Sequence, residues 1–143
     1  MTNIKSGPTI GISDDHPKLR QVLKMCLDLL GYPVILEAEN GKVLIEKIDG
    51  GQLPDICLLD INMPVMNGYD TTSFLKSNWP SVKVLIYSLN EDLPSRNKAF
   101  ECGADGYLVK PCTIDDIQIA IEQIINKNDS LKSGENICIP ARA

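Results

Sequence analysis

The 143-residue chain contains a single histidine, His16, so it offers almost no candidate residues for a serine–histidine hydrolase site. It also lacks G-x-x-x-x-G-K-[ST] and G-x-G-x-x-G, the glycine-rich patterns of common nucleotide-binding loops. No segment approaches the run of about 18 apolar residues that spans a membrane. The first eight residues lack the apolar stretch of a secretory signal, so nothing in them predicts export.

The C-x-x-C spacing is also missing from the five cysteines. Cys57 falls in an apolar run and Cys26 on an apolar helix stripe, whereas Cys102, Cys112 and Cys138 are scattered. Free thiols in a reducing compartment are the simplest interpretation, and we therefore expect a cytoplasmic protein.

Basic residues are outnumbered, with 14 Lys and Arg against 19 Asp and Glu. The net charge is −5, the pI is about 4.8, and no stripe of Lys or Arg occurs. We therefore expect no direct binding of nucleic acid and no membrane association. Hydrophobic residues make up 43% of the chain and charged residues 23%, as in an ordinary globular protein. The length predicts one domain with a real core.

What the chain does have is a regular alternation of short apolar runs and helical segments. The run at 56–59 is continuously apolar, which is typical of a strand buried on both faces. The expected strands are residues 9–13, 32–38, 56–59, 82–88 and 106–109, each followed by a helix. This pattern predicts an α/β fold, (βα)5, with a doubly wound parallel five-stranded sheet in the order 2-1-3-4-5, flavodoxin-like.

The helices carry start and stop signals. Pro17 opens the first helix and Gly31 ends it, and Asn40 caps the second. The fourth helix, residues 91–102, has a thin apolar face. Thr113 caps the last helix, with Asp116 at the third helical position as in a capping box.

The two ends of the chain differ in composition from the expected domain. We expect residues 1–8 to be an N-terminal extension and residues 9–126 to be the domain. Residues 127–143 turn polar and read as a linker-like C-terminal tail, in which 137–143 are too few to form an element alone.

Polar side chains follow four of the expected strands. Because the carboxyl ends of parallel strands meet at one edge of the sheet, we expect these side chains to share a pocket. They are Asp14, Asp15, Asp60, Ser88 and Lys110. Three acids with a lysine and a hydroxyl suit a divalent metal, Mg²⁺, beside a phosphoryl group. Asp55 begins a strand instead and should lie at the opposite end.

Each of these residues has a simpler interpretation. Adjacent Asp14 and Asp15 could be helix-capping acids, although Asp60 converging on them favours a metal site. Asp60, as a nucleophile, can form an acyl phosphate, whereas a solvated turn aspartate would not follow so apolar a strand. Lys110 could be a surface lysine; before Pro111, which can hold a cis bond, it is a fixed point charge for phosphate.

Three stretches of sequence then carry a family resemblance. They are Ser-Asp-Asp-His-Pro at 13–17, Leu-Leu-Asp-Ile-Asn-Met-Pro-Val-Met-Asn-Gly at 58–68 and Gly-Ala-Asp-Gly-Tyr-Leu-Val-Lys-Pro at 103–111. In this order and spacing, over residues 9–126, they resemble the receiver domain of two-component response regulators. The wording is most similar to receivers that precede a helix-turn-helix DNA-binding domain, of which residues 1–143 contain none.

The resemblance implies roles for the polar residues. Asp60 would accept a phosphoryl group from the phosphohistidine of a sensor histidine kinase or a phosphotransfer protein, in phosphorelay signal transduction. Asp15, Asp60 and the backbone carbonyl of Asn62 would bind Mg²⁺, and Asp14 would act through water. Lys110 would contact the phosphoryl oxygens. The chain would catalyse only its own phosphorylation and dephosphorylation and would not otherwise be an enzyme.

The resemblance also implies a switch. Ser88 would move toward the phosphoryl group, and Tyr107 would then turn inward. The signal would leave through the face of the fourth helix, fifth strand and fifth helix, where homodimerisation is a further expectation. Leu89 stands where the family usually has a small residue, and Asn62 and Asn90 occupy positions that tune dephosphorylation.

Three rival functions are weaker. A phosphohydrolase resembling the haloacid dehalogenase class needs an acid two residues after the nucleophile, where this chain has Asn62. A flavodoxin-like cofactor binder would meet an acidic loop that repels phosphate. The intact acids and Lys110 argue against a degenerate receiver that serves only as an interaction module.

Overall fold

The computed structural model describes residues 7–130 and 137–139. Strands and helices alternate along the chain as the apolar pattern predicts. The elements are β1 Ile10–Ser13, α1 Pro17–Leu29, β2 Val34–Ala38, α2 Gly41–Asp49, β3 Ile56–Leu59, α3 Gly68–Asn78, β4 Lys83–Ser88, α4 Leu93–Glu101, β5 Gly106–Val109, α5 Ile114–Ser130 and β6 Ile137–Ile139.

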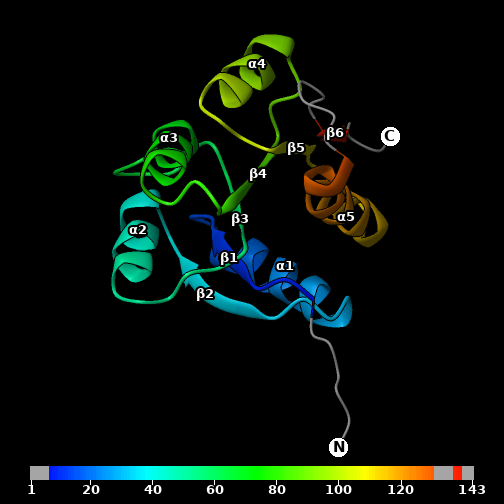
Figure 1. Cartoon of the computed structure of the whole chain (residues 1–143), viewed down its shortest axis with the longest axis horizontal. Coiled ribbons are helices and arrows are strands. Elements are labelled where there is room, and N and C mark those ends of the chain that lie inside the picture. Colours follow the sequence, from blue (N-terminus) through cyan, green and yellow to red (C-terminus); the bar gives the residue numbers. More distant parts are fainter. Residues whose placement is uncertain (1–6, 131–136, 140–143) are drawn as a thin grey trace, which may run out of the picture.

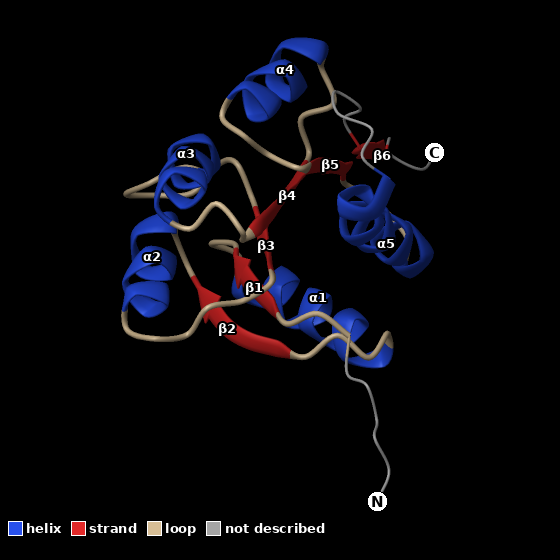
Figure 2. Ribbon diagram, viewed as in Figure 1, coloured by secondary structure: helices blue, strands red, loops and turns tan. Residues whose placement is uncertain are grey.

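The strands form one parallel sheet in the order β2-β1-β3-β4-β5-β6. The five predicted strands and their order 2-1-3-4-5 are therefore confirmed. Helices cover both faces, with α2, α3 and α4 on one side and α1 and α5 on the other (Figures 1 and 2). β3 lies between β1 and β4, so its carboxyl end opens at the middle of the sheet.

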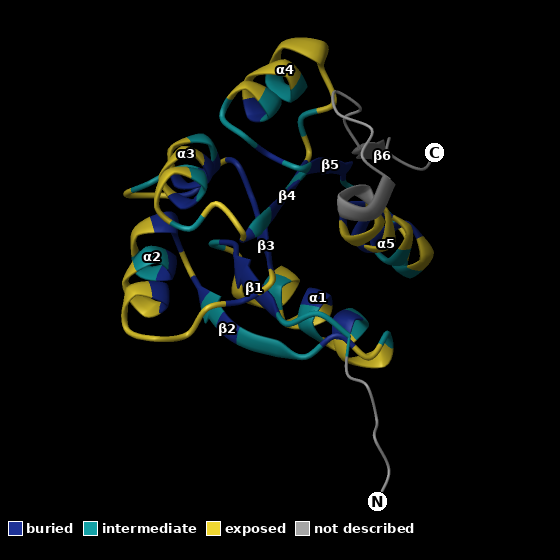
Figure 3. Cartoon of the chain, viewed as in Figure 1, coloured by how far each residue is buried: buried dark blue, intermediate teal, exposed yellow. Residues whose placement is uncertain are grey.

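The core lies between the sheet and each helical layer, as the dark-blue strands of Figure 3 show. One cluster joins the sheet to Leu44 of α2, Leu75 of α3 and Ala99 of α4. The other joins it to Leu27 of α1 and Ile121 of α5. The four residues of β3 are all buried, which confirms the strand predicted from the continuous apolar run. Among the described residues, no helix has the length and apolar character needed to cross a membrane.

Several predicted end signals are confirmed. The Asn40 side chain accepts a hydrogen bond from the Val43 N–H at 3.0 Å, which caps α2. Thr113 and Asp116 form the expected reciprocal pair: the Asp116 carboxylate accepts from the Thr113 N–H, and the Thr113 hydroxyl accepts from the Asp116 N–H. Asp92 caps α4 at Ser95, so this helix begins at Leu93, later than the sequence predicts.

The predicted start of the second strand, residue 32, is two residues early. Tyr32 belongs to the turn that closes α1, because its N–H donates to the Leu27 carbonyl at 2.9 Å. The expected stop at Gly31 is confirmed by its positive φ of 84°, which closes the helix in the left-handed region.

The structure corrects the expected linker-like tail, residues 127–143, in two places. Helix α5 continues to Ser130, and Ile137–Ile139 forms β6. These three residues do not form an element alone, because they pair in parallel with the outer edge of β5, the last of the five expected strands in the sheet. The other predicted parts of the tail, and residues 1–6 of the expected N-terminal extension, lie outside the described residues.

Four cysteines, Cys26, Cys57, Cys102 and Cys112, are free thiols, in agreement with the sequence prediction. Complete burial raises the pKa of Cys57 to about 12, so this thiol stays protonated and acts as an apolar core residue.

Candidate functional site

The carboxyl ends of β1, β3 and β5 bring three acids and one lysine into contact. Asp14 and Asp15 follow β1, Asp60 follows β3, and Lys110 follows β5. Carboxylate oxygens of the three aspartates lie within 4.8 Å of one another. The convergence predicted from strand ends is thus present, and it puts three negative charges into one small, largely buried volume.

Lys110 is the counter-charge of this cluster. Its Nζ lies 3.4 Å from Asp14 Oδ2 and 3.9 Å from Asp60 Oδ1. Its side chain is 9% exposed, so the ammonium is directed inward rather than into solvent. The bond between Lys110 and Pro111 is cis, as the sequence allowed. One ammonium cannot neutralise three carboxylates, so the cluster keeps a negative balance.

The surroundings of Asp60 change the pKa of its carboxyl group. Burial raises the pKa of the Asp60 carboxyl, and the charges of Asp14 and Asp15 raise it further. The Lys110 ammonium and the Ile61 N–H, which donates to Asp60 Oδ1 at 2.8 Å, act in the opposite direction. A carboxylate held at a raised pKa is more basic than an ordinary one and gains from any added cation.

The acids differ in how their oxygens are satisfied. Asp14 Oδ1 accepts a hydrogen bond from the His16 N–H at 2.9 Å, while the His16 side chain itself is exposed. Within the described part of the chain, no donor reaches the buried Asp15 Oδ1. An unpartnered buried carboxylate oxygen beside two further carboxylates is a set of hard donors that suits Mg²⁺. The Asn62 side chain is exposed, and a ligand role for its carbonyl stays a prediction.

Ser88 and Tyr107 both bind the backbone of Asn90. The Ser88 Oγ accepts from the Asn90 N–H at 3.0 Å, and the Tyr107 hydroxyl donates to the Asn90 carbonyl at 2.6 Å. Both side chains are fully buried. Tyr107 was expected to turn inward after phosphorylation, but its ring already lies inside and contacts Phe100 of α4, with ring centroids 6.4 Å apart.

Sequence reasoning missed several residues that support the site. Arg20 donates from Nη1 to the Asp14 carbonyl at 2.6 Å, which ties α1 to the acidic loop. The Ser13 hydroxyl lies 3.1 Å from the Met63 sulfur and links the end of β1 to the loop after β3. Tyr87 places its ring centroid 4.5 Å from Lys110 Nζ. Arg20 and Met63 carry no local sequence signal for these contacts. The Tyr87 contact depends on the register between β4 and β5.

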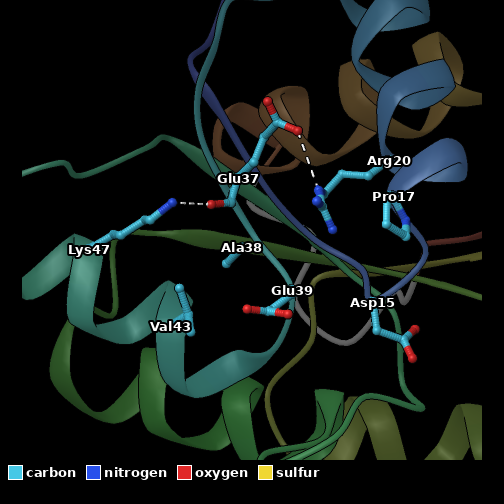
Figure 4. Close-up of a pocket in the computed structure, with 8 residues that line it drawn as sticks. All are labelled: Asp15, Pro17, Arg20, Glu37, Ala38, Glu39, Val43 and Lys47. Atoms are coloured by element: carbon cyan, nitrogen blue, oxygen red, sulfur yellow. Dashed lines mark hydrogen bonds and ion pairs between the residues drawn. The ribbon is translucent and has the colours of Figure 1, made fainter.

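A pocket of about 250 Å³ lies on the α1–β2–α2 side of the acids (Figure 4). Side chains of both charge signs line this pocket, and its two basic residues, Arg20 and Lys47, both contact Glu37. Arg20 lies 3.4 Å from Glu37, and Lys47 donates to the Glu37 carbonyl. The lining residues are Asp15, Pro17, Arg20, Glu37, Ala38, Glu39, Val43 and Lys47. The pocket thus borders the acidic cluster at Asp15.

Comparison with known proteins agrees with this geometry. The family model of the response regulator receiver domain matches residues 10–122. The chain is 36% identical over 116 residues to the nitrate/nitrite response regulator protein NarL of Escherichia coli, matching 80% of this chain and 53% of NarL. It is 29% identical over 120 residues to the chemotaxis protein CheY1 of Helicobacter pylori, matching 82% of this chain and 97% of CheY1.

Solved structures show the same fold. The signal receiver domain of NarL from Mycobacterium tuberculosis superposes with a TM-score of 0.77 at 28% identity, covering 87% of this chain and 98% of that one. A LuxR-family response regulator from Aurantimonas gives a TM-score of 0.81 at 25% identity, covering 94% and 90%. The chain spans about half the length of the first curated relatives it matches. From its matched residues, its acidic cluster and its fold, the chain belongs to the response regulator receiver domain family, the signalling domains of two-component systems.

Proposed function

We propose that Asp60 is the residue of this receiver that accepts the phosphoryl group. The observation that supports the proposal is the position of Asp60 at the carboxyl end of the central strand, among Asp14, Asp15 and Lys110. Asp60 directly follows β3, whose four residues are all buried and which lies between β1 and β4. The donor would be the phosphohistidine of a sensor histidine kinase or a phosphotransfer protein.

Asp14, Asp15 and Asp60 would hold the Mg²⁺ that this family uses, with the Asn62 carbonyl as a further ligand. A bound Mg²⁺ would supply positive charge that offsets the repulsion between the carboxylates and the incoming phosphoryl oxygens. An Asp60 oxygen would attack phosphorus, and the bond from phosphorus to the donor's imidazole nitrogen would break, leaving its electron pair on that nitrogen. Lys110 would then face a phosphoryl oxygen.

Ser88 would couple this event to the surface. Its hydroxyl accepts from the Asn90 N–H, and a movement of this side chain toward a phosphoryl oxygen, to which it would donate, would break that bond and release the Asn90 backbone. Tyr107 binds the same residue through its carbonyl, so a change at Asn90 would pass to Tyr107 and to Phe100 of α4. The phosphate needs only to bias an existing two-state element.

The output surface would be the face of α4, β5 and α5, with homodimerisation as one outcome. β6 bonds to β5 at this face, so a dimer would have to include or displace it. Loss of the acyl phosphate by hydrolysis would reset the receiver. We place the protein in the cytoplasm, where the phosphorylating domains of sensor kinases act, and the net charge of −5 disfavours direct nucleic-acid binding.

The experiment is phosphorylation with acetyl phosphate and Mg²⁺, followed by intact-mass measurement. The wild-type chain should gain one phosphoryl group, and Asp60→Asn should gain none. Asp55→Asn is the matched control, because Asp55 precedes the same strand at its other end. Equal labelling of Asp60→Asn and wild type, or loss of labelling in Asp55→Asn alone, would contradict the assignment.

A further inference from the structure

The Lys110 ammonium has a third partner besides the two carboxylates. Its Nζ lies 4.5 Å from the centroid of the Tyr87 ring, within the range of a cation–π contact. The same atom lies 3.4 Å from Asp14 and 3.9 Å from Asp60. The ring is thus one wall of the space in which the ammonium is held, and the acids are the other.

The second end of Tyr87 contacts the same turn. Its hydroxyl donates a hydrogen bond to the Cys112 thiol, two residues beyond Lys110. Tyr87 therefore contacts the 110–112 turn at both ends, with the ring face at Lys110 and the hydroxyl at Cys112.

Strand register explains why the two residues meet. Tyr87 of β4 is the register partner of Leu108 of β5, and Lys110 lies two residues further along. Side chains two apart in an extended chain point to the same face, so Lys110 projects over the strand end where Tyr87 stands. Ser88 is adjacent to Tyr87 and faces the opposite side.

We propose that Tyr87 is a positioning residue for phosphoryl transfer, holding the Lys110 ammonium on its ring face so that it points at the acceptor site of Asp60. A lysine side chain is flexible and loses rotamer freedom when it is fixed. A ring that holds the ammonium before the phosphoryl group arrives removes part of this loss from the reaction. This inference rests on the proposed role of Asp60.

The first test separates the ring from the hydroxyl. Tyr87→Phe keeps the ring, and Tyr87→Leu keeps apolar bulk without it. With acetyl phosphate and Mg²⁺, we expect Tyr87→Phe to react within about threefold of wild type and Tyr87→Leu to react about 5- to 30-fold more slowly, the range of a partly desolvated cation–π contact. Equal rates for Tyr87→Leu and wild type would overturn the proposal.

The second test is a double-mutant cycle, which distinguishes a residue that acts through Lys110 from one that acts through packing alone. In a Lys110→Gln background, Tyr87→Leu should slow the already reduced reaction by no more than about twofold, because the group it positions is gone. If Tyr87→Leu slows both backgrounds by the same large factor, the residue acts through packing and the proposal is wrong.

NMR supplies a signature that needs no turnover. The Lys110 side-chain protons next to Nζ should show upfield ring-current shifts in wild type and Tyr87→Phe, and should lose them in Tyr87→Leu. Unshifted protons in folded wild-type protein would contradict the geometry even if a variant fails to fold. Labelling of Asp60→Asn would refute the acceptor instead, and would leave this spectroscopic result standing.

Discussion

Two aspartates flank β3, and they have opposite relations to the fold. Asp55, before the amino end, accepts hydrogen bonds from the Thr9 N–H at 2.8 Å and the Thr9 hydroxyl at 3.1 Å. Its own N–H donates back to the Thr9 hydroxyl at 3.0 Å. Asp60, after the carboxyl end, is buried with two like charges, which the Ile61 N–H and Lys110 oppose.

The comparison shows that the two ends of β3 give an aspartate different surroundings and therefore different roles. At the amino end Asp55 is exposed to water and ties β1 to β3, so its charge supports the fold. At the carboxyl end the loops after β1, β3 and β5 converge. Asp60 therefore lies beside charged side chains that come from the other loops. The receiver thus retains an unfavourable cluster of negative charge that a bound cation would relieve.

The largest expected contrast concerns Mg²⁺. Asp15→Asn should weaken Mg²⁺ binding by about tenfold or more, or 1.4 kcal/mol, because a direct carboxylate ligand is lost. Asp55→Asn should leave the affinity unchanged, because this residue lies at the other end of β3. A calorimetric or fluorescence titration measures both variants. An affinity unchanged in Asp15→Asn would refute the direct-ligand role.

In the next contrast, the two variants should change the free energy of unfolding in opposite directions. Without Mg²⁺ at neutral pH, Asp60→Asn should raise the free energy of unfolding by about 1–3 kcal/mol, since a buried, poorly compensated charge is removed. Asp55→Asn should lower it by about 0.5–1.5 kcal/mol, because the Thr9 bonds are weakened. Urea unfolding of the two variants beside wild type measures this. Destabilisation of equal size in both would contradict the comparison.

The pH dependence of the Asp60→Asn gain follows from the raised pKa. The folded state holds the Asp60 proton more tightly than the unfolded state, whose carboxyl has an ordinary pKa near 3.8. Ionisation of Asp60 therefore lowers stability as pH rises from that value through the folded-state pKa. The gain from Asp60→Asn should be full above the folded-state pKa and should shrink as the solution is acidified below it. A gain that grows on acidification would show that the sign is wrong.

The smallest expected effect concerns backbone strain on the same edge of the sheet. Among the described non-glycine residues, Val65 alone has a positive φ, 69°, in the loop after Asp60. A β-branched side chain is strained there, and asparagine tolerates the conformation better. Val65→Asn should therefore stabilise the fold by about 1 kcal/mol. Val65 is 77% exposed, so little packing is lost. Thermal unfolding measures the shift, and a lower melting temperature would contradict the strain.

Much of the fold and site could be predicted because local signals and strand ends agree. Asn40 and Thr113 cap their helices through bonds to neighbours three residues away, which sequence spacing reveals. Asp60 and Lys110 meet because any parallel sheet in this order brings the ends of β3 and β5 to one edge.

The features that were missed depend on tertiary contacts. β6 exists because β5 offers an open edge, and the three residues of β6 carry no strand signal strong enough on their own. Ser88 and Tyr107 share Asn90, and the ring of Tyr87 lies under Lys110, only because register aligns β4 with β5. Such contacts need the distance between side chains of neighbouring strands, which spacing along one strand does not contain.

The most direct test of the account is to identify the phosphorylated residue within the acidic cluster. The acyl phosphate can be reduced with borohydride, which converts the acceptor aspartate to homoserine, and the trypsin-digested chain can then be sequenced by mass spectrometry. Asp14 and Asp15 fall in the tryptic peptide 6–18, whereas Asp55 and Asp60 fall in 48–76. The account predicts homoserine at position 60 and aspartate at the other three positions. Homoserine at position 14, 15 or 55, with aspartate retained at 60, would contradict it.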